Sequence, residues 1–240
     1  MYFNPWMWGM QMDSQIMMYL LIAMLIPLAA QGYLMSTFGR YKKARAAAGL
    51  TGYEVARSML DKNGLHHVQI QQAKRKLGDH YDPKSKTVRL SHDIHDGTSI
   101  AAVAVAAHEV GHAIQHAKNY APLTLRSAFV PVVSIANRLG FLVIIMGMML
   151  EAFVIAEFGI LMIASLFVFQ LITLPVEFNA STRALAQLNE MNLLSDSHET
   201  RGARQVLTAA ALTYVAALVV ALMELLRWVA ILNNSRGRRN

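Results

Sequence analysis

The stretch IAAVAVAAHEVGH, residues 100–112, decides how the rest of the chain is interpreted. Its first eight residues are apolar, and the preceding residues 96–99 (DGTS) supply side chains suited to a helix N-cap. We therefore expect a helix that begins near Ile100 and is buried on all sides. The stretch ends in H-E-x-x-H, in which His108 and His112 are four residues apart and share a helix face. Two imidazoles placed in this way can bind one cation.

Glu109 is rotated by about 100° around the helix from His108, which places it beside such a cation rather than on it. There a carboxylate can act as general base, taking a proton from an attacking water and passing it to a leaving amine. Burying these side chains without partners is costly, so a metal site is favoured over the alternative, a pair of hydrogen-bonded core histidines. Gly111 costs about 1 kcal/mol in mid-helix relative to alanine, which predicts the close approach of a neighbouring element.

A site of this kind needs a third protein ligand. A third histidine on the same helix would require glycine at 115 and histidine at 118, but the chain has Gln115 and Lys118. Glu177 is the best candidate on a second helix, because it follows Leu174-Pro175-Val176 and is predicted to lie in a first helical turn. Weaker alternatives are Glu190, His198 and Glu199.

The composition indicates a membrane protein. Of 240 residues, 55% are hydrophobic and 15% are charged, whereas soluble domains carry about 25% charged residues. The chain has no cysteine, which excludes a disulfide framework and a thiolate metal site. The net charge of +7 is concentrated beside apolar segments, which favours membrane topology over nucleic-acid binding.

Long charge-free stretches predict the membrane helices. The first, Ser14–Gly39, is followed by basic residues from Arg40 onward, so the positive-inside rule places the N-terminus outside and Arg40 in the cytoplasm. A retained anchor is favoured over a cleaved signal peptide, because no basic residue precedes Ile16. The block 129–176 predicts a hairpin of two helices with an acidic turn near Glu151–Glu157.

The last apolar stretch, Gln205–Met223, is open to two interpretations. It can span the membrane or be buried against the catalytic unit, because Glu224, Arg227 and an arginine-rich tail follow it. Two predicted spans separate His112 from Glu177, an even number, so all candidate ligands face the same side. We expect five segments: leader and anchor (1–39), cytoplasmic core (40–128), transmembrane hairpin (129–176), third-ligand helix and polar segment (177–204), and apolar helix with basic tail (205–240).

Local signals predict the secondary structure of the core. Thr51 and Glu54 form a capping box that opens a helix over 52–62, and Asn63-Gly64 ends it. Residues 67–71 and 87–90 are predicted as short strands, with a turn at 82–84 between them.

At these residues the sequence resembles the YugP-type bacterial membrane zinc metallopeptidases, relatives of the HtpX-type gluzincins. The matching stretches are GLTG (49–52), DHYDP (79–83), HEVGHAIQH (108–116), LPVEFNAS (174–181), RGAR (201–204) and AAALTY (209–214). The resemblance implies a mainly α membrane protein with a gluzincin-like catalytic unit, a small β-sheet and three to four transmembrane helices. It implies His108, His112 and Glu177 as ligands of one Zn²⁺ and Glu109 as general base. It also implies a multi-pass protein of the bacterial cytoplasmic membrane, an active site facing the cytoplasm, and strand Thr87–Leu90 as the cleft edge that pairs with substrate.

The sequence departs from the wider gluzincin pattern at Ser181, where HtpX-type relatives carry an aspartate that orients a ligand histidine. A hydroxyl can accept a hydrogen bond from an imidazole N–H but adds no negative charge. Asn179 is a further candidate for this support. His116 is about 12 Å along the axis from His108, so a surface or supporting role is favoured over ligation. Candidates for stabilising the oxyanion of the reaction are His198, Arg201 and Tyr214.

The leading hypothesis is a membrane-embedded zinc endopeptidase that hydrolyses membrane-associated or misfolded proteins through a metal-activated water. The alternative is a non-enzymatic membrane scaffold or partner-binding protein with a structural metal site, which the missing aspartate at position 181 motivates. Expected partners are the lipid bilayer, a peptide or protein substrate and membrane partner proteins, without nucleic acid. Zinc is the expected cofactor, and no organic cofactor site is expected.

Overall fold

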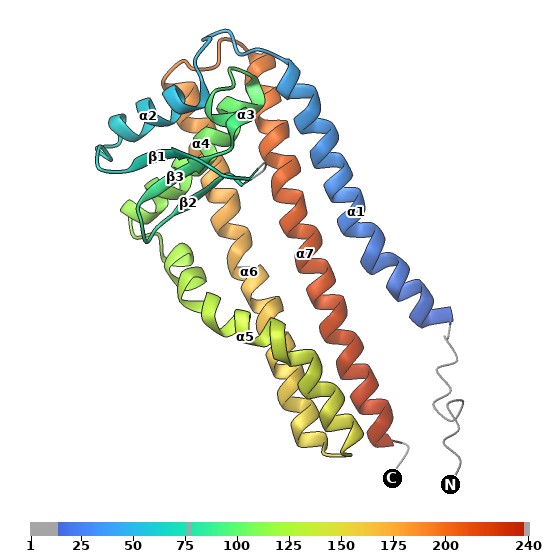
Figure 1. The fold of residues 1–240 in the computed structure, drawn as a ribbon. Helices are drawn as coiled ribbons and strands as arrows, with labels where there is room; N and C mark the ends of the chain where they lie inside the picture. The colour runs from blue at the N-terminus through green and yellow to red at the C-terminus, as the bar shows by residue number, and fades with distance from the viewer. Residues whose placement is uncertain (1–13, 76–77, 238–240) are drawn as a thin grey trace.

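A computed structural model describes residues 14–75 and 78–237, and the chain forms a bundle of long helices with a smaller helix-and-sheet unit at one end (Figure 1). The leader before Ser14 and the tail residues Arg238 and Arg239 lie outside the described residues. Among the described residues, four helices are long and apolar enough to cross a membrane: α1 (Ser14–Lys43), α5 (Ala121–Met149), α6 (Phe153–Glu190) and α7 (Ser197–Gly237). The predicted fold class, a mainly α membrane protein with a small sheet, is confirmed.

The long helices run up and down the bundle, so that the chain enters and leaves it at the end away from the helix-and-sheet unit (Figure 1). Helix α7 contains the stretch 205–223, for which the sequence allows either a membrane span or a buried helix. By length and composition, α7 is the fourth candidate span among the described residues. Large apolar side chains on these helices are exposed, for example Met149, Val154 and Leu161. Exposed apolar side chains on helices of this length suit contact with lipid.

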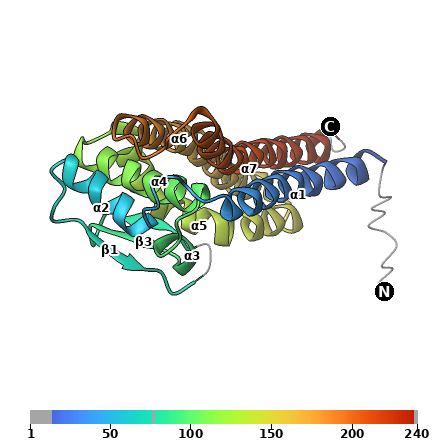
Figure 2. The ribbon, with the colours of Figure 1, turned by 90° about the horizontal axis from the view of Figure 1, so that it is seen from above.

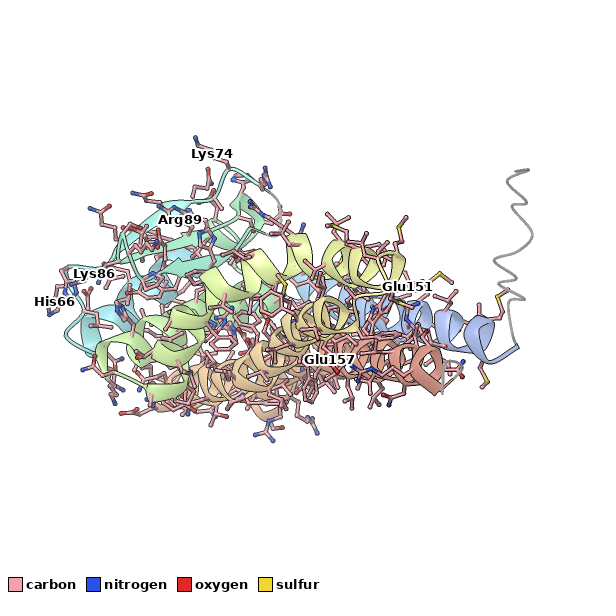
Figure 3. The ribbon with its side chains drawn as sticks, turned by 90° about the horizontal axis from the view of Figure 1, so that it is seen from below. His66, Lys74, Lys86, Arg89, Glu151 and Glu157 are labelled. Carbon is pink, nitrogen blue, oxygen red and sulfur yellow. The ribbon has the colours of Figure 1, made fainter. Side chains whose placement is uncertain are left out.

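The helical hairpin expected over 129–176 is formed by α5 and α6. Its turn holds Glu151 in the left-handed backbone region, at φ 57°. Gly147 lets the two helices meet closely, since a Cβ atom there would lie 2.3 Å from the backbone nitrogen of Ala156. Figure 3 shows the labelled side chains of Glu151 and Glu157 near this turn, away from the basic side chains labelled on the helix-and-sheet unit.

The helix-and-sheet unit follows its local sequence signals. Helix α2 (Gly52–Lys62) has the expected capping box, with the Thr51 N–H donating to Glu54 Oε2 at 2.7 Å and the Glu54 N–H to Thr51 Oγ1 at 3.2 Å. The helix ends at Asn63, and Gly64 has a φ of +71°. A short helix α3 (His92–His95) connects the sheet to α4 (Ile100–Ala117). The Ser99 hydroxyl caps α4 by accepting the Ala102 N–H at 3.2 Å.

The sheet in the described residues has the order β1-β3-β2, with strands β1 (Gln69–Gln72), β2 (His80–Asp82) and β3 (Thr87–Leu90). Strand β1 is parallel to β3 and begins two residues later than predicted. Strand β2 is antiparallel to β3, with Tyr81 opposite Val88. The expectation that Thr87–Leu90 forms the cleft edge is therefore wrong, because β3 is paired on both sides and the edge strands of this sheet are β1 and β2.

Helix α4 lies in the middle of this unit, between α2, the sheet, α6 and α7 (Figure 2). Its alanine- and valine-rich first half is buried as expected, except at Val105, which is only partly buried. The start of a helix at Glu177 is not observed, since α6 runs without a break through Pro175. Proline normally disrupts a helix interior. Here the helix is held on both sides of the exposed Pro175 by buried residues, namely Thr173, Val176 and Glu177.

Candidate metal centre

His108 and His112 of α4 and Glu177 of α6 converge on one point. Each offers one ligand atom, and these atoms lie within 4.8 Å of one another. Glu177 Oε2 is 3.3 Å from His108 Nε2 and 3.6 Å from His112 Nε2. The two imidazole rings stand nearly perpendicular, with their centroids 4.7 Å apart. Two imidazole nitrogens and a carboxylate oxygen are a donor set that Zn²⁺ accepts in sites that keep one position open.

Gln115 links His112 to the second helix. Its amide nitrogen donates to the Val176 carbonyl at 2.8 Å and to Asn179 Oδ1 at 3.1 Å, and its Oε1 is 3.0 Å from His112 Nδ1. Both N–H groups of the Gln115 amide are thus used, so Oε1 accepts and His112 Nδ1 must carry the proton. This leaves the lone pair of His112 on Nε2, the atom that faces Glu177.

The other predicted supporting residues have distinct neighbours. Ser181 Oγ is 3.2 Å from His108 Nδ1, so it can accept the proton of that imidazole. Asn179 contacts Gln115 rather than a histidine, and its Oδ1 also accepts from Arg183 Nε at 2.7 Å. His116 Nδ1 is 2.9 Å from the Tyr81 hydroxyl, which ties β2 to α4. Neither Gln115 nor its link to His112 was predicted, because sequence spacing indicates neither the rotamer nor the partner of a buried amide.

Arg126 of α5 was also missed from the sequence. Its Nη1 is 3.6 Å from Glu177 Oε1, so the two carboxylate oxygens face different partners. The Glu177 side chain is only 3% exposed, and a buried carboxylate needs such partners. In the sequence, an arginine just before an apolar stretch is typical of a juxtamembrane charge. This pattern does not indicate a contact with a carboxylate on another helix.

Electrostatics at the cluster favour a positive charge on the imidazole side. Burial raises the pKa of the Glu109 carboxyl above its usual value. Burial alone would lower the pKa of His112, but the neighbouring carboxylates of Glu177 and Glu109 outweigh it, so the pKa of His112 is raised. The negative potential of the two carboxyl groups, which favours a proton on His112, also favours a bound metal cation.

A cavity of about 420 Å³ opens onto the cluster. Its wall includes Glu109, Arg126 and Tyr214, together with the whole of β2. Tyr214 of α7 lines the same cavity as Glu177. The cavity therefore places a candidate base, a phenol and an edge strand beside the three candidate ligands.

The structure does not bring the remaining candidates to the cluster. His198 is exposed in the first turn of α7, about 24 Å along the helix axis from Tyr214. Glu199 Oε1 instead accepts the Ala47 N–H at 2.7 Å, and its Oε2 accepts the Ser195 N–H at 2.8 Å. Glu190 Oε1 lies 2.8 Å from Lys62 Nζ.

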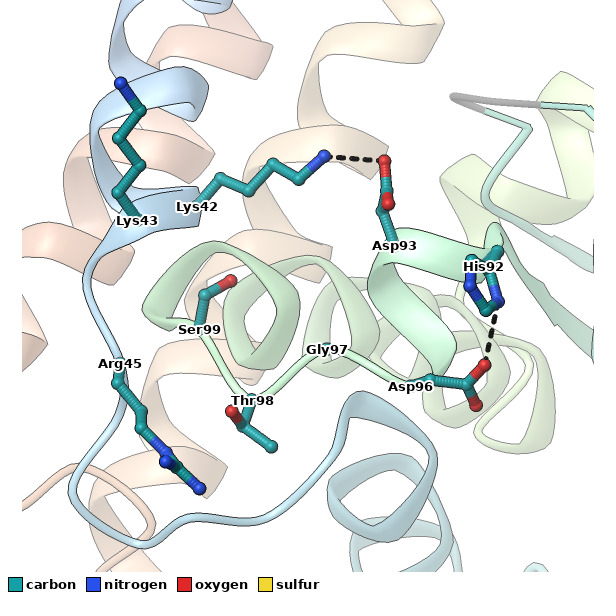
Figure 4. Close-up of a pocket in the computed structure, with 9 residues that line it drawn as sticks. All are labelled: Lys42, Lys43, Arg45, His92, Asp93, Asp96, Gly97, Thr98 and Ser99. Atoms are coloured by element: carbon teal, nitrogen blue, oxygen red, sulfur yellow. Dashed lines mark hydrogen bonds and ion pairs between the residues drawn. The ribbon is translucent and has the colours of Figure 1, made fainter.

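Another pocket lies at the N-terminus of α4, at the junction with the end of α1 (Figure 4). Lys42 Nζ is 2.6 Å from Asp93 Oδ2, and His92 Nδ1 is 2.8 Å from Asp96 Oδ2. These side chains are paired with one another. The predicted ligands and Glu109 do not line this pocket, which is therefore separate from the candidate metal centre in the described part of the chain.

Comparisons with known proteins identify the family of the chain. The "Putative membrane protease YugP" of Bacillus subtilis (strain 168) is 46% identical over 207 residues, which cover 86% of this chain and 92% of the relative. No solved structure matches the chain. The family described as "Putative neutral zinc metallopeptidase" matches residues 16–233, which include His108, His112 and Glu177. With its apolar helices and its membrane-protease relative, the chain is a multi-pass membrane protein and belongs to this zinc metallopeptidase family.

Proposed function

We propose that the protein is a membrane-embedded zinc endopeptidase. The observation that carries the proposal is the convergence of His108, His112 and Glu177 beside Glu109 and an open cavity. His108 and His112 would hold one zinc ion through Nε2, and Glu177 through Oε2. Zinc bound there supplies a Lewis acid that polarises the scissile carbonyl and makes water a stronger acid. The protonated Nδ1 atoms, facing Ser181 and Gln115, keep both Nε2 atoms available for the ion.

The remaining roles follow from where the side chains lie around the cavity. Glu109 accepts the proton of the attacking water and delivers it to the leaving amine, because its side chain lines the cavity beside the three candidate ligands. Tyr214 is the candidate of the three that lines the cavity, and its phenol can donate to the developing oxyanion. Strand β2 presents an edge on which an extended peptide can pair.

We further propose that the protein lies in the bacterial cytoplasmic membrane with this site on the cytoplasmic side. Arg40, Lys42, Lys43 and Arg45 are at the end of α1 that joins the helix-and-sheet unit. Basic residues beside a span favour the cytoplasmic side. Glu177 is about 36 Å along α6 from Phe153, just beyond the roughly 30 Å of a hydrocarbon core.

The test uses the full chain, purified with zinc, and the variant Glu109→Gln. We expect the wild type to hold about one zinc and to cleave a peptide library, and Glu109→Gln to lose cleavage while keeping the zinc. Removal of the metal by a chelator should stop cleavage, and added zinc should restore it. Cleavage that survives Glu109→Gln would remove this residue from the mechanism. A cellular phenotype that is lost on deletion but kept by Glu109→Gln would instead favour the scaffold alternative.

A further inference from the structure

A second cavity, of about 300 Å³, reaches the candidate metal centre from between α1 and α7. It shares Asp79, Glu109 and Tyr214 with the first cavity, together with His108 and Glu177. The rest of its wall is mainly apolar and comes from Leu34, Met35 and Phe38 of α1 and from Leu207 and Ala210 of α7. The metal cluster is thus bordered both by a cavity with the polar strand β2 and by an apolar one between two candidate spans.

Helix α1 is fastened to α7 on both sides of this apolar cavity. At the end near the helix-and-sheet unit, the Tyr41 hydroxyl donates to Gln205 Oε1 at 2.9 Å. Toward the other end, the Arg227 guanidinium lies 5.3 Å from the centroid of the Tyr19 ring. The cavity lies between these contacts along both helices, and α1 is exposed there at Gln31 and Met35. The cavity is therefore bounded at both ends by contacts between α1 and α7, and it is open at one edge toward the surface of α1.

The open edge lies near the membrane boundary. Leu34 is about 30 Å along α1 from Ser14, which is the thickness of a hydrocarbon core. At this level, the transmembrane helix of a membrane-protein substrate would end and its polar juxtamembrane chain would begin. Such a juxtamembrane segment is apolar on one side of a given peptide bond and polar on the other. This matches the apolar α1–α7 cavity and the cavity along β2, which is the more polar of the two.

We propose that the α1–α7 cavity is a specificity subsite that takes large apolar side chains next to the scissile bond, from the juxtamembrane segment of a membrane-protein substrate. The inference rests on the proposed peptidase function and adds to it the class of substrate. An apolar side chain that leaves water for this cavity gains binding free energy, whereas a polar one there loses its hydrogen bonds to water. Cleavage should therefore select large apolar residues on one side of the cut.

The test profiles cleavage of a peptide library by the zinc-loaded full chain and reads the residues on each side of the cut by mass spectrometry. We expect large apolar residues to be enriched about tenfold or more on one side. Ala210→Phe fills the cavity and should abolish this enrichment while peptides with small residues there are still cut. Leu34→Ala enlarges the cavity and should shift the enrichment toward larger residues. Leu212→Phe, on the exposed face of α7, should keep the wild-type profile.

A binding experiment gives a readout without cleavage. Because the chain has no cysteine, Ala210→Cys in zinc-loaded Glu109→Gln protein places a single thiol in the cavity. A peptide with large apolar residues should slow its modification by a maleimide, and its serine-substituted analogue should not. Leu212→Cys should react equally with and without either peptide. A cleavage profile without apolar selection, or one unchanged by Ala210→Phe, overturns the subsite. A thiol at position 210 that no peptide protects from the maleimide also overturns it, because lipid rather than substrate would then fill the cavity. A wild type that cuts nothing overturns both the subsite and the proposed function.

Discussion

A Cβ atom on Gly111 would lie 2.6 Å from the carbonyl oxygen of Ala180, so α4 and α6 meet backbone to backbone at this point. The contact confirms the close approach that a glycine in mid-helix predicted. It lies between His108 and His112 on one helix and just beyond Glu177 on the other. The distance between the helices at Gly111 therefore sets how far the carboxylate stands from the two imidazoles.

We predict that Gly111→Ala weakens zinc binding and stability together. The new methyl group must push the α6 backbone away, and overpacking of this kind costs about 1–3 kcal/mol, more than the roughly 1 kcal/mol that alanine gains in helix propensity. Zinc affinity by competition with a chelator and thermal unfolding in detergent measure the two effects. Gly39→Ala is the matched control, since a Cβ atom there meets nothing within 4 Å. Unchanged zinc affinity in Gly111→Ala would contradict the role given to this crossing.

A second prediction concerns Gln115. Gln115→Leu removes the acceptor of the His112 Nδ1 proton and both donors to α6, so the imidazole is free to rotate or to change tautomer. We expect zinc affinity to fall about 10–100-fold, the usual cost of losing a residue that orients a metal ligand. Gln187→Leu is the control, because that amide pairs with Asn63 and Glu190 instead. Equal zinc affinities for the two variants would show that the hydrogen bond at 3.0 Å does not orient His112.

Much of this architecture was predictable because its signals are local. The capping box at Thr51 and Glu54 and the N-cap at Ser99 depend on side chains within three residues, and both helices begin where these residues indicate. The spacing of His108 and His112 likewise depends on one helix alone. The apolar helices were predictable because crossing a bilayer requires long charge-free stretches.

What was missed depends on contacts between distant segments. Strand β2 has three mostly polar residues, a pattern that does not predict a strand. It forms because it pairs with β3. Pro175 predicted a helix boundary, but packing on α4 carries α6 through it. The contact of Arg126 with Glu177 joins residues on different helices, and charge patterning assigns such an arginine to the membrane surface. Local sequence cannot indicate which partner a buried polar group finds across the fold.

The pH dependence of the β2–β3 turn is a third prediction. The Ser85 hydroxyl donates to the Asp82 carboxylate, as do Arg89 and the Lys84 N–H, and these hydrogen bonds lower the pKa of Asp82 from its usual range to about 2. Because the pKa of Asp82 is lower in the folded than in the unfolded state, its ionised carboxylate stabilises the fold at pH values above the pKa of the unfolded state. This stabilisation is lost as the pH falls through the pKa of the folded state. Asp82→Asn should therefore speed amide exchange in β2 at pH 7, with the difference from wild type shrinking between pH 4 and 2.

The control for that experiment is Asp61→Asn, because the Asp61 carboxylate pairs with Arg57 and His66 and not with the β2–β3 turn. This variant should leave exchange in β2 as in the wild type. A difference between Asp82→Asn and wild type that persists unchanged down to pH 2 would mean that the charge of Asp82 does not hold the turn.

The last prediction separates Tyr214 from His198 as the group that stabilises the oxyanion. Tyr214 lines the cavity at the metal cluster, whereas His198 is exposed about 24 Å away along the same helix. Loss of one oxyanion donor typically lowers kcat by about 10²–10³-fold. Tyr214→Phe keeps the ring but removes the hydroxyl, so kcat should fall by this factor while zinc content and KM stay close to wild type. His198→Ala should keep wild-type kcat. If instead His198→Ala lost activity and Tyr214→Phe kept it, the cavity at α4 and α6 would not be where the peptide bond is cut, because His198 cannot reach that cavity along a rigid α7.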